Sequence, residues 1–557
     1  MKAKPSCQII ASVLAAQGVR DAVVSPGSRN TPFILALDDE SEITKHVVID
    51  ERSAAFMALG IAQVTRRPVV LCCTSGTALL NYAPAVAEAY YQGVPLIIVS
   101  ADRPTEWIDQ DDSQTLRQCE ALANYVKASF DIPDFGPESK ALCWYANRIA
   151  NDAYLTAVTG RHGPVHVNIH CADPLSAQCP VVGPQRIVQA VDTASALSPS
   201  IMKELAAEAA GRRILVVAGQ YPPSDRINRA MTVLSHLPNV AVWAESIANV
   251  HTPGIVGCID RTLLAIDPDD DAYRPDIVIS FGGALVSRMA KAFLRGLDRC
   301  EHWSVAWRRD RVSDPFMRLT RIIETSPDIF MPHFANALCR CHPHGEYADT
   351  WNAAAIAAAN RHARKLEAAP WSALKAFETI LGRIPAKMNL QLSNGTAIRY
   401  AQLFDCRHVH ASYCNRGVSG IDGSTSTAIG AALRYSHPTL LISGDMSFAY
   451  DIGALAAPVI PADFKAVVIN NRGGEIFRFI PTTASLPCRE RYFSASPVLP
   501  LKALAEAYGF GYFQCASERG LKTALPDFLA PSLAPSILEV NVDPDISART
   551  LSEYFKQ

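Results

Sequence analysis

Short apolar runs alternate with helix-length segments along most of the chain. Between residues 22 and 169 the runs are AVVS, HVVID, PVVLCCTS, PLIIVSAD and PVHVNIH. Runs of this length, rich in Val and Ile, predict buried strands, and their alternation with helices predicts βαβ units in a parallel sheet. Gly18 and Gly93 stand where helices should end, a position that favours glycine. The pattern predicts a first α/β domain over residues 1–180.

The segment CPVVGPQRIVQAVDTASALSPS loses this periodicity and gains Pro and Ser, which indicates a linker. Beyond it, ILVVAG, VAVWAES, DIVISFGG and HWSVAW predict a middle α/β domain over residues 195–345. The Ala-rich stretch WNAAAIAAANRHARKLEAA predicts a connecting helix. HVHAS, TLLISGD, FKAVVINN and SILEVNV then predict a third domain over residues 381–557. The predicted fold class is α/β, with three consecutive α/β domains and mainly parallel sheets.

Composition narrows the function classes. The chain has 557 residues, 49% of them hydrophobic, and 52 basic against 54 acidic side chains give a formal charge of −2. This balance indicates neither a nucleic-acid groove nor a membrane surface. No run approaches the roughly 20 apolar residues of a membrane span, and the start, MKAKPSCQIIASVLAAQ, lacks a plausible signal-peptide cleavage site. We therefore expect a cytoplasmic enzyme that acts on small molecules.

The 15 cysteines are scattered, and some lie inside apolar runs, as Cys72 and Cys73 do. This distribution is typical of reduced core residues and not of a disulfide framework. One cluster, MPHFANALCRCHPH, contains His333, Cys339, Cys341, His342 and His344. Structural zinc sites usually have two pairs of ligands, whereas this segment has one Cys-x-Cys. A surface loop is the alternative that we favour.

The strongest chemical signal is GDMSFAYDIGALAAPVIPADFKAVVINNRGG, in which Asp445 ends one strand and Asn470 and Asn471 end the next. Consecutive parallel strands end at the same edge of a sheet. Because Mg²⁺ prefers oxygen ligands and a diphosphate supplies only some of them, Asp445, Asn471 and the Gly473 carbonyl are candidate metal ligands. Ser447 and backbone N–H groups at the helix start are candidates to hold phosphate. Two ordinary buried strands are the alternative.

This spacing resembles the signature of thiamine diphosphate enzymes, Gly-Asp followed about two dozen residues later by Asn-Asn. Met446 stands where that signature usually has glycine. In VVIDERSAAFMALGIAQ, Glu51 follows a strand and opens a helix. Thiamine catalysis needs a buried carboxyl that exchanges a proton with N1′ of the aminopyrimidine, and an apolar site raises the pKa of such a group. The helix macrodipole alone also favours Glu at this position.

Polar residues follow several other predicted strands. SPGSRN presents Ser28 and Arg29 before a helix, which can form a carboxylate-binding corner. Similar junctions carry Ser75, Gly76, Arg103, Gln114, Arg288, Asn394, Thr396, Arg399, Arg416, Ser419 and Ile421. Each arginine taken singly is more often a surface residue. Five of them at strand-to-loop junctions predict a site for acidic substrates.

Eight segments occur along the chain in this order: SPGSRNTPF, DERSAAFMALGIA, TSGTALLNYAPAVAEA, ADRP, GPVHVN, NRGVSGIDG, GDMSFAYD and NNRGGEIF. On these segments the chain resembles the 2-succinyl-5-enolpyruvyl-6-hydroxy-3-cyclohexene-1-carboxylate synthase family of menaquinone biosynthesis. The resemblance implies a pyrimidine-binding (PYR) first domain, a central domain without cofactor and a diphosphate-binding (PP) third domain. It also implies at least a homodimer, commonly a homotetramer, since the two cofactor-binding halves come from different subunits.

The resemblance further implies roles for individual residues. Glu51 is expected to be the catalytic pyrimidine partner, and Asp445, Asn471 and Gly473 to hold Mg²⁺ or Mn²⁺. The other cofactor contacts implied are Ser75, Gly76, Ser419, Ile421, Met446 and Ser447. The substrates, 2-oxoglutarate and isochorismate, are expected to meet Ser28, Arg29, Arg103, Gln114, Arg288, Thr396, Arg399, Arg416 and an apolar wall of Ile476, Phe477 and Ile480. Gly395 and Arg472 depart from the family pattern, which often has serine and asparagine there.

The implied reaction is thiamine diphosphate-dependent decarboxylation of 2-oxoglutarate and conjugate addition of the succinyl unit to isochorismate. Another thiamine-dependent 2-oxo-acid lyase or synthase is the nearest alternative, although such enzymes need fewer arginines. A non-catalytic α/β regulator has little reason to keep Glu51 together with Asp445 and Asn471. A Rossmann dehydrogenase is disfavoured because no Gly-x-Gly-x-x-Gly follows a strand.

Overall fold

The structure is a computed structural model that describes residues 3–175, 179–191, 193, 195–307 and 312–556. Parts of the predicted linker therefore lie outside the described residues. The chain forms two compact units. The first comprises Met1–Asp192, Gly417–Thr439 and Tyr450–Phe464, and the second comprises Thr193–Arg416, Leu440–Ala449 and Lys465–Gln557.

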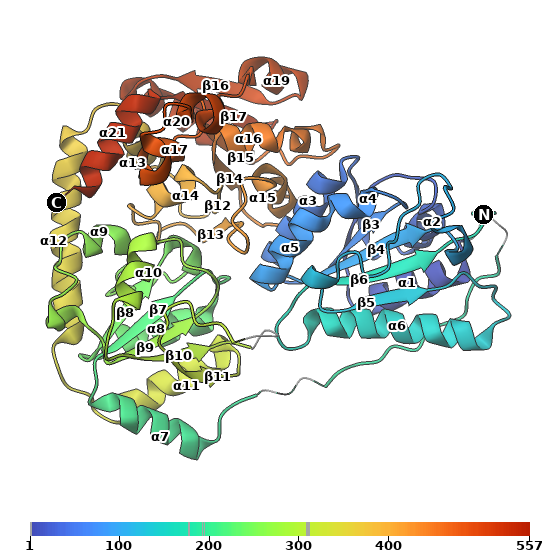
Figure 1. The fold of residues 1–557 in the computed structure, drawn as a ribbon, viewed down its shortest axis with the longest axis horizontal. Helices are drawn as coiled ribbons and strands as arrows, with labels where there is room; N and C mark the ends of the chain where they lie inside the picture. Colours follow the sequence, from blue (N-terminus) through green and yellow to red (C-terminus); the bar gives the residue numbers. More distant parts are fainter. Residues whose placement is uncertain (1–2, 176–178, 192, 194, 308–311, 557) are drawn as a thin grey trace. The chain divides into compact units, whose positions relative to one another are not determined.

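The first unit is built on a six-stranded sheet in which every pairing is parallel. Its strand order is β2 (Thr44–Val47), β1 (Asp21–Val24), β3 (Val69–Cys73), β4 (Leu96–Asp102), β6 (Val165–His170) and β5 (Ser129–Ile132). Alternate residues of the central strands pack against α1 (Pro5–Ala16), α2 (Thr31–Asp39) and α6 (Lys140–Val158). The helices α3 (Glu51–Thr65), α4 (Ala78–Asn81) and α5 (Ala83–Gln92) cover the other face (Figure 1). This is a doubly wound sheet, as the period of two along each strand requires.

The second unit contains two sheets. One is a five-stranded parallel sheet in the order β11 (Leu319–Ile323), β10 (Glu301–Val305), β9 (Ile277–Phe281), β7 (Ile214–Ala218) and β8 (Val240–Ala244). Its two faces bury different residues of the same strands. One face packs against α7 (Pro199–Ala210), α8 (Asp225–Ser235) and α11 (Pro327–Cys339). The other packs against α9 (Ile259–Leu263), α10 (Arg288–Arg295) and α12 (Tyr347–Ala368).

The remaining sheet has the order β13 (Ala411–Cys414), β12 (Asn389–Leu392), β14 (Thr439–Gly444), β15 (Phe464–Asn470), β17 (Ser536–Asn541) and β16 (Gly511–Cys515). The pairs β12–β13, β15–β17 and β16–β17 are parallel. One face buries α13 (Ala373–Leu381), α14 (Thr396–Ala401), α20 (Glu518–Leu529) and α21 (Pro544–Phe555). The loops carry α16 (Asp445–Tyr450), α17 (Ile476–Phe479), α18 (Pro481–Ala484) and α19 (Leu501–Ala507). The predicted α/β class with parallel sheets is confirmed.

Thirteen predicted strands are present, and within the described part of the chain four further strands were not predicted: β5, β11, β12 and β16. Three of these four are edge strands, whose residues are only partly buried and do not form a continuous apolar run. The fourth, β12, is interior but has Asn389 and Gln391 among its buried residues, and Gln391 Nε2 donates to Asn389 Oδ1 at 3.2 Å. The predicted Ala-rich helix is α12, and it ends before Pro370.

The sequence predicts reduced cysteines in the core and no membrane-spanning segment. All 15 cysteines are free, and Cys72 and Cys73 are buried in β3. The segment MPHFANALCRCHPH begins within α11 and not in a loop, so that part of the prediction was wrong. Among the described residues, no group of three His, Cys, Asp or Glu side chains is placed to hold a metal ion. None of the helices in the described part of the chain is long and apolar enough to cross a membrane.

Two glycines allow α3 to cross α15 (Ser424–Ala432) closely within the first unit. A Cβ added at Gly60 would lie 2.0 Å from the Thr427 carbonyl oxygen, and one added at Gly430 would lie 2.0 Å from the Met57 carbonyl oxygen. These contacts involve backbone atoms, which cannot turn away as a flexible side chain can. Only glycine fits at either position without a shift of the helices.

We expect Gly430→Ala to destabilise the first unit by about 1–3 kcal/mol, the usual cost of overpacking a close contact. The urea midpoint of the unfolding transition measures the change. Gly183→Ala is the control, because a Cβ at Gly183 meets no atom within 4 Å. Equal midpoints for the two variants would contradict the tight crossing.

Candidate functional site

In the second unit, Asp445 and the turn after β15 lie together at the ends of adjacent strands. Asp445 is 2% exposed, and its carboxylate accepts hydrogen bonds from the backbone N–H of Met446 at 2.8 Å and of Gly473 at 2.8 Å. Burial raises the pKa of Asp445 to about 6, although these backbone bonds oppose the rise. Gly473 has φ +126°, and a Cβ there would lie 2.2 Å from the Ser494 carbonyl oxygen. Glycine is therefore required where the chain turns beside Asp445.

Asn471 is buried beside this turn, and in the described part of the chain only one end of its side-chain amide is hydrogen-bonded. Its Nδ2 donates to Glu475 Oε2 at 2.6 Å, whereas its Oδ1 is buried and has no hydrogen-bond partner among the described residues. The neighbouring Asn470 uses both ends, since Nδ2 donates to Glu539 Oε1 at 2.6 Å and Oδ1 accepts from the Arg472 N–H at 3.2 Å. An orphaned amide oxygen near a buried carboxylate fits a divalent cation, which prefers oxygen ligands. Asp445, Asn471 and Gly473 thus suit the metal that the sequence predicts.

Asp445, Met446 and Ser447 are the first three residues of the short helix α16. Met446 is half-buried, and Ser447 is 3% exposed. The predicted phosphate contacts therefore lie next to the candidate metal ligands. Thr396, at the start of α14, is brought to the same place, because its hydroxyl hydrogen-bonds Glu475.

Three of the predicted substrate arginines gather in the second unit. Burial, and next the charges of Arg288 and Arg416, lower the pKa of Arg399. Arg416 is 7% exposed, and its Nη1 donates to Asn394 Oδ1 at 2.9 Å. Lys291 joins them, because burial and then Arg416 lower its pKa. Asp260 and Glu245 offset part of this positive charge, and the excess of cations over carboxylates fits a site for acidic ligands.

A buried carboxylate that the sequence did not single out supports Arg288. Glu245 is 2% exposed and accepts the backbone N–H groups of Val286 and Ser287 at 2.7 Å each. Burial raises the pKa of Glu245 to about 7. Arg288 is the next residue and begins α10, with Ser287 as its cap. The predicted apolar wall, Ile476, Phe477 and Ile480, lies half-buried at α17 of the same unit.

The other predicted residues belong to the first unit. Glu51 is the first residue of α3, whose cap Asp50 accepts from the Arg52 N–H at 3.0 Å. Burial chiefly raises the pKa of Cys73 and of Tyr82, and the Glu51 charge adds to both. Glu51 therefore lies near the carboxyl end of β3. The sequence predicts a buried carboxyl at this position, but Glu51 is only half-buried in the single chain.

Ser75 and Gly76 follow β3 in a turn held by a glutamine that the sequence analysis missed. The Gly76 N–H donates to Gln118 Oε1 at 2.8 Å, and Gln118 Nε2 donates to the Ala101 carbonyl at 3.1 Å. Gly76 has φ +87°, and a Cβ there would lie 3.5 Å from Gln114 Cα. The structure therefore brings Gly76 and Gln114, two predicted contact residues, together.

Arg103 is held at its backbone by two buried side chains. Asp102 accepts the Arg103 N–H at 2.8 Å, and His170 Nδ1 bonds the Arg103 carbonyl. His170 Nε2 pairs with Asp131 at 3.0 Å. Burial acts to lower the pKa of His170, but Asp131 and the Arg103 carbonyl outweigh it and raise the pKa to about 9. The Arg103 guanidinium itself contacts Asp112 and the Ser113 carbonyl, each at 2.7 Å.

Ser28 and Arg29 follow β1 as predicted. Ser28 is exposed, whereas Arg29 is buried with its Nη1 2.8 Å from the Cys171 carbonyl and 3.4 Å from Asp173. Ser419 and Ile421 lie on the loop before α15. That loop is held by Glu88 of α5, which accepts the N–H groups of Gly417 at 2.6 Å, Val418 at 2.7 Å and Ser419 at 3.4 Å. A lone Glu in the apolar run AVAEA is the signal that could have indicated Glu88.

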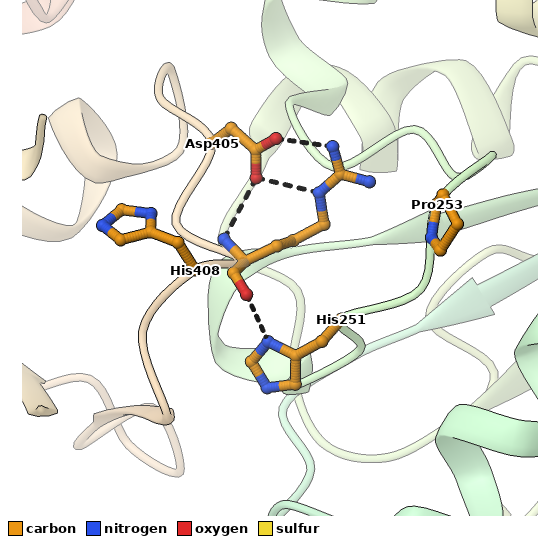
Figure 2. A pocket seen from close by; sticks show the side chains of 5 residues that line it. His251, Pro253, Asp405 and His408 are labelled. Atoms are coloured by element: carbon orange, nitrogen blue, oxygen red, sulfur yellow. Dashed lines mark hydrogen bonds and ion pairs between the residues drawn. The ribbon is translucent and has the colours of Figure 1, made fainter. Parts of the chain in front are cut away.

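A surface hollow of about 390 Å³ lies elsewhere in the second unit, lined by His251, Pro253, Asp405, Arg407 and His408 (Figure 2). None of the predicted site residues lines it. Arg407 Nε donates to Asp405 at 2.8 Å, and His251 Nδ1 bonds the Arg407 carbonyl at 2.8 Å. Because Asp405 neutralises the arginine, this hollow lacks the free positive charge that acidic substrates need.

The parallel sheets, with Asp445 beside the turn after β15, indicate the class of protein. Residues 7–121 match the family described as "Thiamine pyrophosphate enzyme, N-terminal TPP binding domain", and residues 393–540 match its "C-terminal TPP binding domain". The first match covers Glu51, and the second covers Asp445, Asn471 and Gly473. Together they define a thiamine diphosphate enzyme.

The relatives are more specific. Proteins named "2-succinyl-5-enolpyruvyl-6-hydroxy-3-cyclohexene-1-carboxylate synthase" from Porphyromonas gingivalis and Flavobacterium psychrophilum are 39% and 36% identical, over 99% of this chain and 97% and 98% of theirs. A protein of the same name from Desulfotalea psychrophila is 34% identical over 98% of this chain and 99% of its own. The chain belongs to this synthase family, thiamine diphosphate-dependent transferases of menaquinone biosynthesis.

The His170–Asp131 pair predicts a pH dependence of stability. A histidine pKa raised to about 9 contributes stability that is fully present below the ordinary value of 6.5 and is lost as the pH rises through 9. We expect His170→Gln to lower the urea midpoint at pH 7, and the difference from the unmodified protein to shrink as the pH approaches 10.

His166→Gln is the matched control on the same strand. Burial lowers the pKa of His166 to about 4, so this histidine is neutral throughout the range from pH 7 to 10. Its effect on the midpoint should stay constant over that range. A constant difference for His170→Gln as well would rule out a charged His170.

Proposed function

We propose that the chain catalyses the decarboxylation of 2-oxoglutarate and the conjugate addition of the succinyl unit to isochorismate, with 2-succinyl-5-enolpyruvyl-6-hydroxy-3-cyclohexene-1-carboxylate and CO₂ as products. The observation that carries the catalytic part is the arrangement of Asp445, the unpaired Asn471 oxygen and the Gly473 turn. The names of the full-length relatives support the choice of product.

The cofactor-binding roles divide between the two units. Asp445, Asn471 and the Gly473 carbonyl would hold Mg²⁺ or Mn²⁺, with Met446 and Ser447 beside the diphosphate. Ser75, Gly76, Ser419 and Ile421 would contact the thiamine rings. When bound, thiamine diphosphate supplies the electron sink that decarboxylation requires. The two fixed loops, held by Gln118 and Glu88, support this assignment because a preformed site loses little entropy on binding.

Glu51 is the proposed proton-transfer residue, at N1′ of the bound aminopyrimidine. Its place at the start of α3, near buried Cys73 and Tyr82, supports this role. We propose that the chain works as a homodimer at least, commonly paired into a homotetramer, and that a partner subunit completes the burial of Glu51. In that assembly residues 1–180 form the pyrimidine-binding domain, 195–345 the central domain and 381–557 the diphosphate-binding domain.

The arginines account for the acidic substrates. Arg288, Arg399 and Arg416, with Lys291 nearby, would bind carboxylates of 2-oxoglutarate or isochorismate, together with Ser28, Arg29, Arg103, Gln114 and Thr396. Guanidinium groups fix the orientation of a carboxylate through paired hydrogen bonds. Ile476, Phe477 and Ile480 would exclude water on one side, which favours loss of a carboxylate as CO₂.

An assay of the purified protein with thiamine diphosphate, Mg²⁺, 2-oxoglutarate and isochorismate tests this function. Isochorismate absorbance should fall only when both organic acids are present. Release of CO₂ from 2-oxoglutarate or pyruvate at full rate without isochorismate would instead favour another thiamine-dependent 2-oxo-acid lyase or synthase.

Glu51→Gln should lower the turnover number by at least about a hundredfold, because removal of a positioned proton-transfer group has an effect of this size. The KM values should change far less, since the substrates contact other residues. Glu42→Gln is the control, as it makes the same chemical change at an exposed position. Near-normal turnover of the Glu51 variant would refute the role of Glu51.

A further inference from the structure

Glu475 is a buried carboxylate that neither the sequence motifs nor the family resemblance single out. It is 3% exposed and lies just after the Gly473–Gly474 turn. The Tyr400 hydroxyl donates to its Oε1 at 2.7 Å, Asn471 Nδ2 donates to its Oε2 at 2.6 Å, and the Thr396 hydroxyl also bonds it. Among the described residues, no Lys or Arg forms an ion pair with it. Glu475 therefore accepts its hydrogen bonds from neutral donors.

The hydrogen bond from Asn471 determines which end of its amide faces the candidate metal position. A carboxylate has only acceptor oxygens, so the nitrogen end of the amide must face Glu475. The oxygen end is then turned away from Glu475, and it is this atom that is buried without a partner. An unsatisfied buried acceptor costs about 1–3 kcal/mol. A bound cation would remove that cost.

Asn470 shows what an adjacent asparagine does with a different partner. Its nitrogen end also faces a carboxylate, Glu539, but its oxygen end already accepts the Arg472 N–H. The Asn470 oxygen therefore already accepts a backbone donor, whereas the Asn471 oxygen accepts none among the described residues. The two asparagines are distinguished by their surroundings and not by their chemistry.

We propose that Glu475 is a positioning residue that holds the Asn471 amide with its oxygen toward the divalent cation, and that Tyr400 holds Glu475 in turn. The inference rests on the proposed metal site. Outer partners of this kind fix the orientation of metal ligands, and their loss typically costs about 10–100-fold in metal affinity. Without Glu475, the amide is free to turn and present its nitrogen.

Binding of Mn²⁺ to the protein with saturating thiamine diphosphate tests the proposal without a turnover measurement. Electron paramagnetic resonance of free Mn²⁺ gives the dissociation constant. Glu475→Met removes both acceptor oxygens at similar volume, and we expect it to weaken Mn²⁺ binding about 10–100-fold. Glu539→Met, the same change beside Asn470, is the matched control and should leave the affinity within about twofold, since Asn470 is not a ligand.

A double variant separates orientation from a general structural effect. In Glu475→Met combined with Asn471→Asp, the aspartate offers an oxygen whichever way it turns, so Mn²⁺ binding should be tighter than in Glu475→Met alone. A merely structural loss would not be recovered in this way. Should Glu475→Met fail to fold, as judged by circular dichroism, Glu475→Gln takes its place; with one acceptor oxygen left for several donors, it should bind Mn²⁺ measurably more weakly.

Asp445→Ala separates failure of the positioning role of Glu475 from failure of the proposed metal site. Lost Mn²⁺ binding in Asp445→Ala with unchanged binding in the Glu475 variants would overturn the positioning role and leave the proposed function intact. Unchanged binding in Asp445→Ala would instead remove the proposed metal site itself.

Discussion

Buried acceptor side chains that bind the N–H groups of loop backbones hold the strand-to-helix loops on which the candidate site is built. Where a parallel strand ends and the chain turns into a loop, the backbone N–H groups of the loop no longer have a partner in the sheet. A buried N–H without an acceptor costs free energy of folding. Carboxylates and one glutamine meet this need: Glu88 for Gly417–Ser419, Asp102 for Arg103, Gln118 for Gly76, Glu245 for Val286 and Ser287, and Asp445 for Gly473. The loops are fixed before any ligand arrives.

The same need explains two buried carboxylates, Glu245 and Glu475, that form no ion pair among the described residues. Glu245 and Glu475 have pKa values raised to about 7 by burial, yet each accepts at least two hydrogen bonds from neutral donors. Glu245 also lies near cations: the Arg416 charge opposes the rise in the pKa of Glu245, and the Glu245 charge opposes the fall in the pKa of Lys291. The four cations Arg288, Arg399, Arg416 and Lys291 outnumber the carboxylates near them, so the cluster is suited to anionic ligands.

Much of the fold could be predicted from the sequence because central strands of parallel sheets are buried on both faces and so form apolar runs. The runs before Ser25, Ser75, Asp445 and Asn471 all proved to be strands. Edge strands such as β5 and β16 were not predicted, because their residues are only partly buried and need not form an apolar run. The interior strand β12 was not predicted because buried Asn389 and Gln391, which share a hydrogen bond, interrupt its apolar pattern.

The site divides in the same way. By itself the sequence determined that Asp445 and Asn471 end neighbouring strands, that Glu51 opens a helix and that arginines follow several strands, because these are local consequences of strand order and apolar spacing. Only the tertiary structure decided that Asn471 and not Asn470 has a free oxygen, that Arg288 lies near Arg399 and Arg416, and that Glu88 and Gln118 hold loops distant in sequence. Hydrogen bonds and charge act over a few ångströms in space, and the partner that satisfies a buried group is chosen by packing, which sequence spacing does not specify.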